Sequence, residues 1–333
     1  MAEPRFLVVR LGSLGDIVHT LPAVAGLREG FPRAHIVWLV DERWRLVIER
    51  SGLASEIWNV NTRTWSSLRQ TIAQLRKLKW DAAIDYQGLW KSALLPFLGG
   101  LHRRIGFDAA TIREFGVPML YTDRVHVLTA HIADQNGELS LRTGARSGTA
   151  SFTLRVAPEE VSSWEEDLRR FEIGRYIAIC PGGGWRSKSW PAERYGELCS
   201  RISDELGLRS IVNHGPGERD LANAVLAASA KAKPVVEGGS LEKLMAQLKR
   251  AALVIGGDTG PLHLGVALGT RAVGLYGPTD PRRNGPYLTN DIVLRSPSAI
   301  TDHRRGSAPD PSILEISVDD VMNAVRRRLE NPS

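Results

Sequence analysis

Asp258, Thr259 and His263 stand in a glycine-rich turn, within the run Ile255-Gly-Gly-Asp-Thr-Gly-Pro-Leu-His-Leu264. Apolar residues lead into the run from position 251 and continue to 268, so the pattern predicts a strand, a turn and then a helix. The first N–H groups of a helix lie unpaired at the positive end of its dipole, where they bind anions. The turn therefore offers donors to a phosphate and polar side chains to a sugar. An ordinary turn capped by Asp258 is the alternative for this motif alone.

A second turn, Leu11-Gly-Ser-Leu-Gly-Asp16, follows the apolar run 6–10. Its glycine spacing matches neither the dinucleotide pattern nor the P-loop, which argues against a nicotinamide or ATPase site. Asp16 comes after the carboxyl end of the expected strand, where ligands bind in open α/β sheets. Simple helix capping by Asp16 is the alternative. Pro22 predicts a kink, or a helix that begins later.

The third turn, Pro181-Gly-Gly-Gly-Trp-Arg-Ser-Lys188, follows the apolar run 176–180. Three consecutive glycines let a ligand approach the backbone closely. Lys188 supplies a point charge suited to a diphosphate. A disordered linker is the alternative, but the strand-like run before it and the helix start after Trp190 disfavour that interpretation.

Strand-like and helical segments alternate throughout, which indicates parallel sheets covered by helices on both faces. We expect strands at 6–10, 35–40, 57–60, 82–85, 104–107, 176–180, 210–214, 234–237, 253–256 and 272–276. Residues 142–151, rich in Gly, Ser, Thr and Arg, are expected to be a flexible join. We therefore predict two domains, 1–155 and 156–333, with a C-terminal helix at 318–329 that packs back on the first.

Composition limits the class of protein. A chain of 333 residues with 43% hydrophobic and 24% charged residues is typical of a soluble protein of two domains. No run approaches the ~20 apolar residues that span a bilayer. The run Met1-Ala-Glu-Pro-Arg5 leads directly into a strand, so we expect no signal peptide and a cytoplasmic location. Two cysteines, Cys180 and Cys199, indicate neither a disulfide framework nor a zinc site.

The net charge of +6 comes largely from scattered arginines, which are typical of a solvated surface. A nucleic-acid partner is not expected, because no known reader module is present. Attraction to an anionic membrane or to an acidic substrate also fits the charge.

Segments spread over nearly the whole chain resemble glycosyltransferase family 9, in the family's order. They are Ser13-Leu-Gly-Asp-Ile-Val-His-Thr-Leu-Pro22, Ala83-Ile-Asp-Tyr-Gln-Gly-Leu-Trp-Lys-Ser92, Lys188-Ser-Trp-Pro191, Asp258-Thr-Gly-Pro-Leu-His263 and Tyr276-Gly-Pro-Thr-Asp280. The second of them, with Thr111-Ile-Arg-Glu114, is most similar to family members that add the first heptose of lipopolysaccharide. The resemblance implies a GT-B fold: two Rossmann-like domains facing a central cleft, the N-terminal one for the acceptor and the C-terminal one for the donor.

It also implies the reaction: inverting transfer of heptose from ADP-L-glycero-β-D-manno-heptose to Kdo of lipid A–Kdo, at the cytoplasmic face of the inner membrane. The matching positions make Asp16 the catalytic base and Lys188 a catalytic cation. Around the donor they place Gly183, Gly184, Lys188, Glu218, Gly239, Asp258, Thr259, Gly260 and His263. For the anionic acceptor we expect cations after strand ends of the first domain: Arg63, Lys91 and Arg113, with His131 as a further candidate. A salt bridge of Arg113 with Glu114, and a bond of His263 within its own turn, are the structural alternatives.

Direct displacement with inversion needs a base for the acceptor hydroxyl and stabilisation of the leaving diphosphate. Without an acidic metal-binding cluster, backbone N–H groups, a helix dipole and Lys188 would stabilise it, so we expect no metal and no cofactor. Family members often have Thr-Thr and acidic residues before this lysine, whereas this chain has Gly-Gly-Trp-Arg-Ser, which leaves phosphate binding to the N–H groups of Gly183 and Gly184. The family's basic segment after the third strand is reduced to Arg63.

Other functions remain open at this point. The same fold serves epimerases and transferases for other nucleotide sugars, and a non-catalytic nucleotide-sugar binder would not need the Asp16 carboxylate. We expect a monomer.

Overall fold

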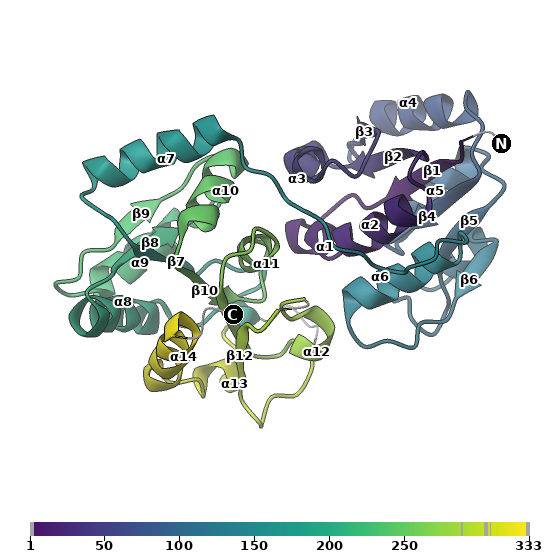
Figure 1. Cartoon of the computed structure of the whole chain (residues 1–333). Coiled ribbons are helices and arrows are strands. Elements are labelled where there is room, and N and C mark those ends of the chain that lie inside the picture. The colour runs from purple at the N-terminus through teal and green to yellow at the C-terminus, as the bar shows by residue number, and fades with distance from the viewer. Residues whose placement is uncertain (1–2, 288, 303–305, 307, 331–333) are drawn as a thin grey trace. The chain divides into compact units, whose positions relative to one another are not determined.

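A computed structural model describes residues 3–287, 289–302, 306 and 308–330. The chain divides into two compact units, Met1–Leu154 and Arg155–Ser333 (Figure 1). Each unit is built on one six-stranded sheet whose strands are all parallel. Parallel strands need crossover connections, and here helices form most of them.

In the first unit the strand order is β3-β2-β1-β4-β5-β6. The strands are β1 (Arg5–Val9), β2 (His35–Val40), β3 (Glu56–Asn59), β4 (Ala82–Asp85), β5 (Arg104–Phe107) and β6 (Asp123–Val125). The helices are α1 (Leu14–Val18), α2 (Leu21–Gly30), η1 (Glu42–Trp44), α3 (Arg45–Ser51), α4 (Trp65–Arg76), α5 (Trp90–Leu98), η2 (Val117–Leu120) and α6 (Ile132–Leu141). Central strands β1 and β2 are almost wholly buried, as expected for strands covered on both faces.

Pro22 separates two helices, as predicted. The short α1 ends at Val18, and α2 begins at Leu21 with Pro22 in its first turn, where the missing N–H costs nothing. Asp16 is thus carried on a separate helical turn directly after β1.

Residues 142–151 are not a free tether, which corrects the prediction. The N–H of Ala150 donates to Pro22 O at 2.9 Å. A Cβ on Gly26 of α2 or Gly137 of α6 would lie 2.8 Å from Gly148 O or Thr149 Cγ2, respectively. The small residues that suggested flexibility instead allow the segment to pack closely on α2 and α6.

In the second unit the strand order is β12-β11-β10-β7-β8-β9. The strands are β7 (Tyr176–Cys180), β8 (Arg209–Asn213), β9 (Val235–Glu237), β10 (Leu253–Gly257), β11 (Ala272–Tyr276) and β12 (Ile292–Arg295). The helices are α7 (Pro158–Arg170), η3 (Arg186–Lys188), α8 (Ala192–Leu206), α9 (Arg219–Ala228), α10 (Leu241–Arg250), α11 (Gly260–Ala267), α12 (Pro281–Asn284), α13 (Pro311–Leu314) and α14 (Val318–Glu330).

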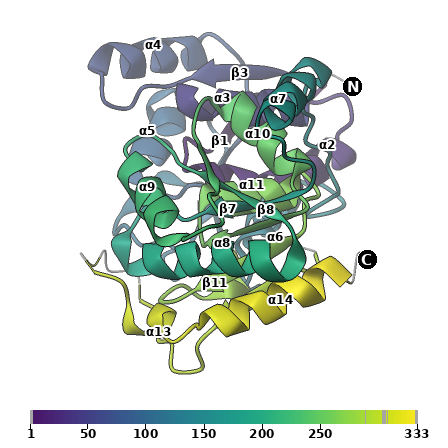
Figure 2. The ribbon, with the colours of Figure 1, turned by 90° about the vertical axis from the view of Figure 1, so that its left-hand side faces the viewer.

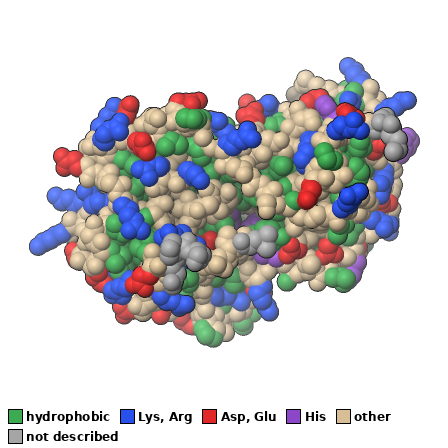
Figure 3. Space-filling view, viewed as in Figure 1, with side chains coloured by type: hydrophobic (Ala, Val, Ile, Leu, Met, Phe, Trp, Pro, Cys, Tyr) green, Lys and Arg blue, Asp and Glu red, His purple; other side chains and the backbone are tan. Residues whose placement is uncertain are grey.

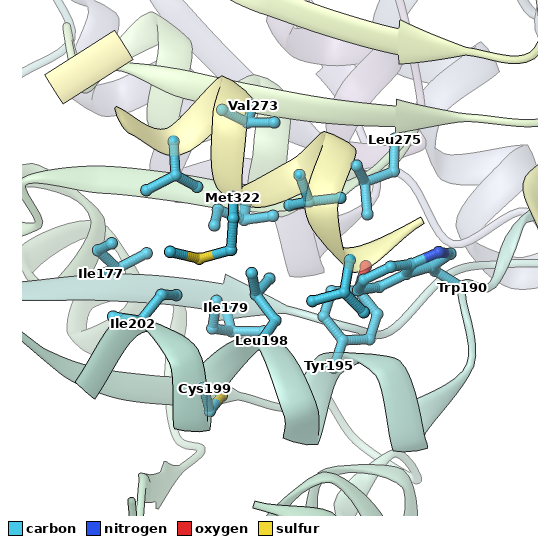
Figure 4. Packing of buried hydrophobic residues seen from close by; sticks show 14 of the residues in the cluster. Ile177, Ile179, Trp190, Tyr195, Leu198, Cys199, Ile202, Val273, Leu275 and Met322 are labelled. Atoms are coloured by element: carbon cyan, nitrogen blue, oxygen red, sulfur yellow. The ribbon is translucent and has the colours of Figure 1, made fainter. Parts of the chain in front are cut away.

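The C-terminal helix α14 lies in the core of the second unit, the domain in which it was predicted, and its packing on the first domain stays a prediction. Val321, Met322 and Val325 are fully buried in a cluster with residues of β7, β11 and α8 (Figure 4). Figure 2 shows α14 beside α8, and Arg201 of α8 pairs with Asp319 of α14 at 2.5 Å. The apolar face of the helix is therefore satisfied within its own unit.

Charged side chains of both signs are interspersed over the visible face in Figure 3. Such mixing fits the interpretation of the scattered arginines as a solvated surface. None of the described helices is long and apolar enough to cross a membrane.

Candidate active site

Strand order places the predicted donor residues at one sheet edge in the second unit. β7 lies between β10 and β8, and β8 pairs with β9, so the chain reverses its direction of winding between β7 and β10. Ligands of open α/β sheets bind outside the carboxyl ends of strands at such a switch point. The three donor loops 181–185, 214–218 and 258–260 follow the carboxyl ends of β7, β8 and β10, and Gly239 follows β9.

Lys188, Asp258 and His263 form a buried polar cluster at the switch point. Lys188 Nζ lies 2.6 Å from Asp258 Oδ2, and His263 Nε2 lies 3.0 Å from Asp258 Oδ1. The Asp258 side chain is only 5% exposed. Burial alone would raise its pKa, but the hydrogen bond from His263 and the charge of Lys188 outweigh burial and hold the pKa well below its usual range. Asp258 is therefore an anion that fixes a cation and an imidazole.

The turn-bonding alternative accounts for part of this geometry, whereas Asp258 does not cap α11, whose N-cap is Thr259 with no side-chain cap bond. His263 does bond within its own turn, because position 263 lies one helical turn beyond Asp258 in α11. Lys188 contacts Trp185 as well as Asp258, since its Nζ lies 4.5 Å from the centre of the Trp185 ring. The cluster is thus preorganised by residues of its own two loops.

Donors without partners surround the cluster. Within the described part of the chain, the backbone N–H groups of Gly183 and Gly184 have no acceptor. A Cβ built on Gly184 would meet nothing within 4 Å, so the loop is open on that side. The hydroxyl of Thr259, the residue before α11, is buried and finds no partner among the described residues. These groups could hold an anion.

Glu218 lies where the loops after β7 and β8 meet. Its Oε2 accepts the N–H of Gly215 at 2.9 Å. A Cβ on Gly182 would lie 2.2 Å from the same oxygen, so a side chain at position 182 would displace the Glu218 carboxylate. The sequence singled out Gly183 and Gly184 and missed this close approach. Gly239 has a φ of +142°, which favours glycine.

Thr279 is a site residue that the sequence reasoning did not assign. It follows β11, which pairs with β10, and it is 3% exposed. Its hydroxyl has no partner among the described residues. Its place in Tyr276-Gly-Pro-Thr-Asp280, one of the segments that resemble the family, was the available signal.

In the first unit, Asp16 is held by two neighbours. The N–H and the hydroxyl of Ser13 each donate to Oδ2 at 3.0 Å, and Arg10 Nη2 lies 2.7 Å from Oδ1. The helix-start role offered as the alternative is therefore observed. The Asp16 side chain is nevertheless 41% exposed, whereas Arg10 is buried. The carboxylate is accessible and fixed in orientation, as a base must be.

A buried carboxylate ties the loops after β4 and β5 together. Asp85 accepts hydrogen bonds from the hydroxyls of Ser92 and Tyr121, both at 2.8 Å. Burial raises the pKa of Asp85 above its usual value, although these bonds and two backbone N–H bonds oppose the rise. Gln87 Oε1 accepts the N–H of Leu11 at 2.8 Å, which connects the same region to the turn that carries Asp16.

The three predicted acceptor cations are not equally placed. Lys91 is the second residue of α5, which follows β4, and Arg113 follows β5. β4 pairs with β1 and β5 pairs with β4, so both cations lie near the carboxyl ends of strands close to β1. Arg63 follows β3, on the other side of β1. Glu114 Oε2 accepts the N–H of Trp90 at 2.6 Å, and no ion pair of Arg113 with Glu114 or another described acid is found. His131 caps α6, since its Nδ1 accepts the N–H of Ala133 at 3.2 Å.

Two parallel-sheet units with an anion-binding switch point match a known family. The family model of glycosyltransferase family 9 (heptosyltransferase) matches residues 68–309. The chain belongs to glycosyltransferase family 9. It is therefore a transferase enzyme, and the predicted α/β fold class and family are confirmed.

Curated and structural relatives agree with this assignment. Lipopolysaccharide heptosyltransferase 1 of Escherichia coli O18:K1:H7 is 29% identical over 88% of this chain and 92% of its own. The E. coli heptosyltransferase WaaC, solved with ADP-2-deoxy-2-fluoro heptose, is 26% identical with a TM-score of 0.75, over 97% of this chain and 99% of that one. A family 9 glycosyltransferase of Veillonella parvula shares the fold, with a TM-score of 0.85 at 23% identity over 99% and 98% of the two chains.

Among the residues that the structure describes, no group of three or more His, Cys, Asp and Glu side chains is placed to hold a metal ion. The cation and the unpaired backbone donors described at the switch point are Lys188 and the N–H groups of Gly183 and Gly184.

Proposed function

We propose that this enzyme transfers heptose from ADP-heptose to Kdo of the lipopolysaccharide inner core, with inversion at the anomeric carbon. The observation that carries the donor half is the Lys188–Asp258–His263 cluster beside the unpaired N–H groups of Gly183 and Gly184. Support for heptose comes from the relatives, one named lipopolysaccharide heptosyltransferase 1 and one solved with an ADP-heptose analogue. The proposed domain roles are donor binding by the second unit and acceptor binding by the first.

The donor's diphosphate would lie against the carboxyl ends of β7 and β10. There the N–H groups of Gly183 and Gly184, the start of α11 and the ammonium of Lys188 would stabilise the charge that grows as the sugar–phosphate bond breaks. Asp258 holds Lys188 in place and leaves its remaining hydrogens for phosphate oxygens. Glu218 would accept hydrogen bonds from the ribose hydroxyls, and Thr259 would donate to or accept from the donor.

Asp16 would act as the general base. The acceptor hydroxyl oxygen forms the new bond to the anomeric carbon, its proton passes to the Asp16 carboxylate, and the electron pair of the broken bond leaves with ADP. A single displacement inverts the anomeric centre. Arg10 and Ser13 keep the carboxylate in one orientation during this step. The proposal requires the donor sugar to come within reach of Asp16.

The acceptor would be lipid A–Kdo, whose phosphates and carboxylates call for cations. Lys91 and Arg113 are the better placed of the predicted cations, and the run from Ala83 to Ser92 is most similar to family members that add the first heptose. We further propose that the enzyme works without metal or cofactor, as a monomer, on the cytoplasmic face of the inner membrane.

The test is a transfer assay with the purified chain. ADP-heptose, UDP-sugars and GDP-sugars are each offered with lipid A–Kdo, and products are identified by mass spectrometry. We expect one added heptose from ADP-heptose alone, and loss of the product in Asp16→Asn. Transfer from another nucleotide sugar, epimerised donor without transfer, or donor binding that produces nothing would each overturn the proposal in favour of another transferase, an epimerase or a binder.

A further inference from the structure

Three large apolar side chains are exposed together on the first unit. Phe115 is 97% exposed, Met119 76% and Trp90 42%. All three surround Gly116: a Cβ there would lie 3.0 Å from Trp90 Cζ2, and the N–H of Met119 donates to Gly116 O at 3.0 Å. Trp90, Phe115 and Met119 are called the apolar patch below. Such a patch on a folded surface marks an interaction site more often than chance.

Cations border the apolar patch. Lys91 and Arg113 are exposed neighbours of Trp90 and Phe115 in sequence. Arg124 is exposed and its Nε donates to Pro118 O at 2.9 Å, so the guanidinium lies over the same η2 turn that carries Met119. The acid within the segment, Glu114, accepts the N–H of Trp90 and is outnumbered by the three cations Lys91, Arg113 and Arg124. The border of the patch is therefore positive on balance.

The segment that carries the patch is anchored. Val117 and Tyr121 are buried against Ala93 of α5, with Ile112 and Leu120 packed around them. Tyr121 also donates to the buried carboxylate of Asp85 at 2.8 Å. Since the backbone is fixed on both sides, Phe115 and Met119 are held outward and are not free to turn into the core.

We propose that the apolar patch docks on an anionic lipid bilayer. Phe115 and Met119 would enter the boundary between headgroups and acyl chains, Trp90 would lie at the headgroup level, and Lys91, Arg113 and Arg124 would pair with lipid phosphates. Apolar side chains ringed by cations have the composition that this interface selects. The inference rests on the proposed function, because only transfer to a lipid-borne acceptor requires the enzyme to work at a bilayer.

The position of the patch serves that purpose. β1, β4 and β5 are parallel neighbours, so the segments after their carboxyl ends lie at one edge of the sheet. These segments carry Asp16, Trp90 and Phe115 respectively. Docking would therefore bring the sheet edge that carries the proposed base to the bilayer surface from which the acceptor projects.

Vesicle flotation tests the proposal with the full chain. Vesicles of phosphatidylglycerol and phosphatidylethanolamine are compared with vesicles of phosphatidylcholine, at low and high salt. We expect binding to the anionic vesicles, with a fraction that persists at high salt because it is apolar. The double variant Phe115→Ser/Met119→Ser should partition at least tenfold more weakly, and Arg124→Gln should reduce the salt-sensitive fraction.

The matched control is Leu141→Ser. Leu141 is 46% exposed in the same unit, but it ends α6, whose ten residues carry the chain about 15 Å away from the carboxyl edge of the sheet. The control should bind vesicles like the parent. Equal binding by Phe115→Ser/Met119→Ser and the parent, or equal loss in the control, would overturn the proposal.

Two further measurements separate the possible occupants and the two proposals. Turnover of an acyl-free, water-soluble acceptor should be unchanged in Phe115→Ser/Met119→Ser, while the KM for the vesicle-bound acceptor rises. Sedimentation velocity should show the parent and the double variant in the same oligomeric state. If the parent self-associates and the double variant does not, the patch binds a second copy of the chain and the lipid assignment fails. Normal vesicle binding without heptose transfer would instead overturn the proposed function and leave the docking inference standing.

Discussion

Arg10 and Asp16 form an ion pair of 2.7 Å in which the cation is buried and the carboxylate is 41% exposed. Arg10 also donates to the backbone oxygen of Tyr86, the residue after β4, so the guanidinium is held by a second element besides Asp16. Ser13 donates to Oδ2 of Asp16 and Arg10 Nη2 lies against Oδ1, so the carboxylate is held in one orientation. The exposed part of that carboxylate is the side that an acceptor hydroxyl would approach.

Replacing Asp16 separates its proposed roles. Asp16→Asn keeps an oxygen for Ser13 but removes the base, so turnover should fall by ~10² to 10⁴ with little change in donor affinity. The melting temperature should also fall, because the buried Arg10 guanidinium loses its anionic partner. Asp16→Ala should show the same loss of turnover and also lose the bond at the start of α1, at a cost of about 0.5–2 kcal/mol in unfolding free energy. Steady-state kinetics measure the turnover of both variants, and thermal unfolding measures their stability. Near-normal turnover in Asp16→Asn would remove Asp16 from the mechanism.

Lys188→Ala should weaken donor binding by about 1.5–3 kcal/mol, the contribution of a charge-assisted hydrogen bond, which is roughly tenfold to a hundredfold in Kd. It should also lower the melting temperature, because the buried Asp258 carboxylate loses its ammonium partner and keeps the hydrogen bond with His263. Calorimetric titration with ADP measures the first effect. Lys249→Ala is the control, since its ammonium donates to Leu268 O at the far end of α11 and should not affect ADP binding. Unchanged ADP affinity in Lys188→Ala would contradict the donor assignment.

The central strands were predictable because each is a continuous apolar run that leads into a glycine-containing turn. Val9, Cys180 and Gly257 end β1, β7 and β10 at the turns that hold the candidate residues. The edge strands β6 and β12 were missed: Asp123–Val125 and Ile292–Arg295 are short and only partly buried, so neither shows a buried-strand pattern. The core contacts of the C-terminal helix with β7, β11 and α8 were not predicted, because amphipathicity reveals an apolar face but not its partner.

Residues that act through tertiary contacts were also missed. Arg10 ends an apolar run and is indistinguishable in sequence from any strand-end arginine, yet it lies buried beneath Asp16. Asp85 and Tyr121 are far apart in sequence, and only the pairing of β4 with β5 brings them together. The close approach of Gly182 to the Glu218 carboxylate joins loops after two different strands. Spacing along the chain carries no signal for such contacts.

Activity should survive thorough removal of divalent metal. The proposed leaving-group charge is stabilised by Lys188 and by the N–H groups of Gly183 and Gly184, which EDTA does not remove. Initial rates are measured after EDTA treatment and after addition of Mg²⁺. A rate that collapses in EDTA and returns with Mg²⁺ would show that this assignment of charge stabilisation is wrong.

Acid should destabilise the second unit through Asp258. Its pKa is lower in the folded chain than in the unfolded chain, so the stabilisation is present above the unfolded pKa of about 4 and is lost as pH falls toward the folded value. Asp258→Asn should be less stable at pH 7, by about 1–3 kcal/mol, and the difference from the parent should shrink below pH 4. Thermal unfolding between pH 7 and pH 3 provides the comparison. A difference that stays constant over this range would show that the charge of Asp258 does not contribute.

Arg113→Ala should raise the KM for the acceptor and leave ADP binding unchanged. The structure gives the guanidinium no described acid as partner, because Glu114 accepts the N–H of Trp90, so its removal should cost little stability. Arg33→Ala is the control: Arg33 is exposed in the same unit, but it precedes β2 and lies at the opposite end of the strands. Kinetics with an acyl-free acceptor separate recognition by Arg113 from its contribution to bilayer docking. A lower melting temperature with intact kinetics would instead make Arg113 a structural residue and move the acceptor site to other cations, of which Lys91 would be the next to replace.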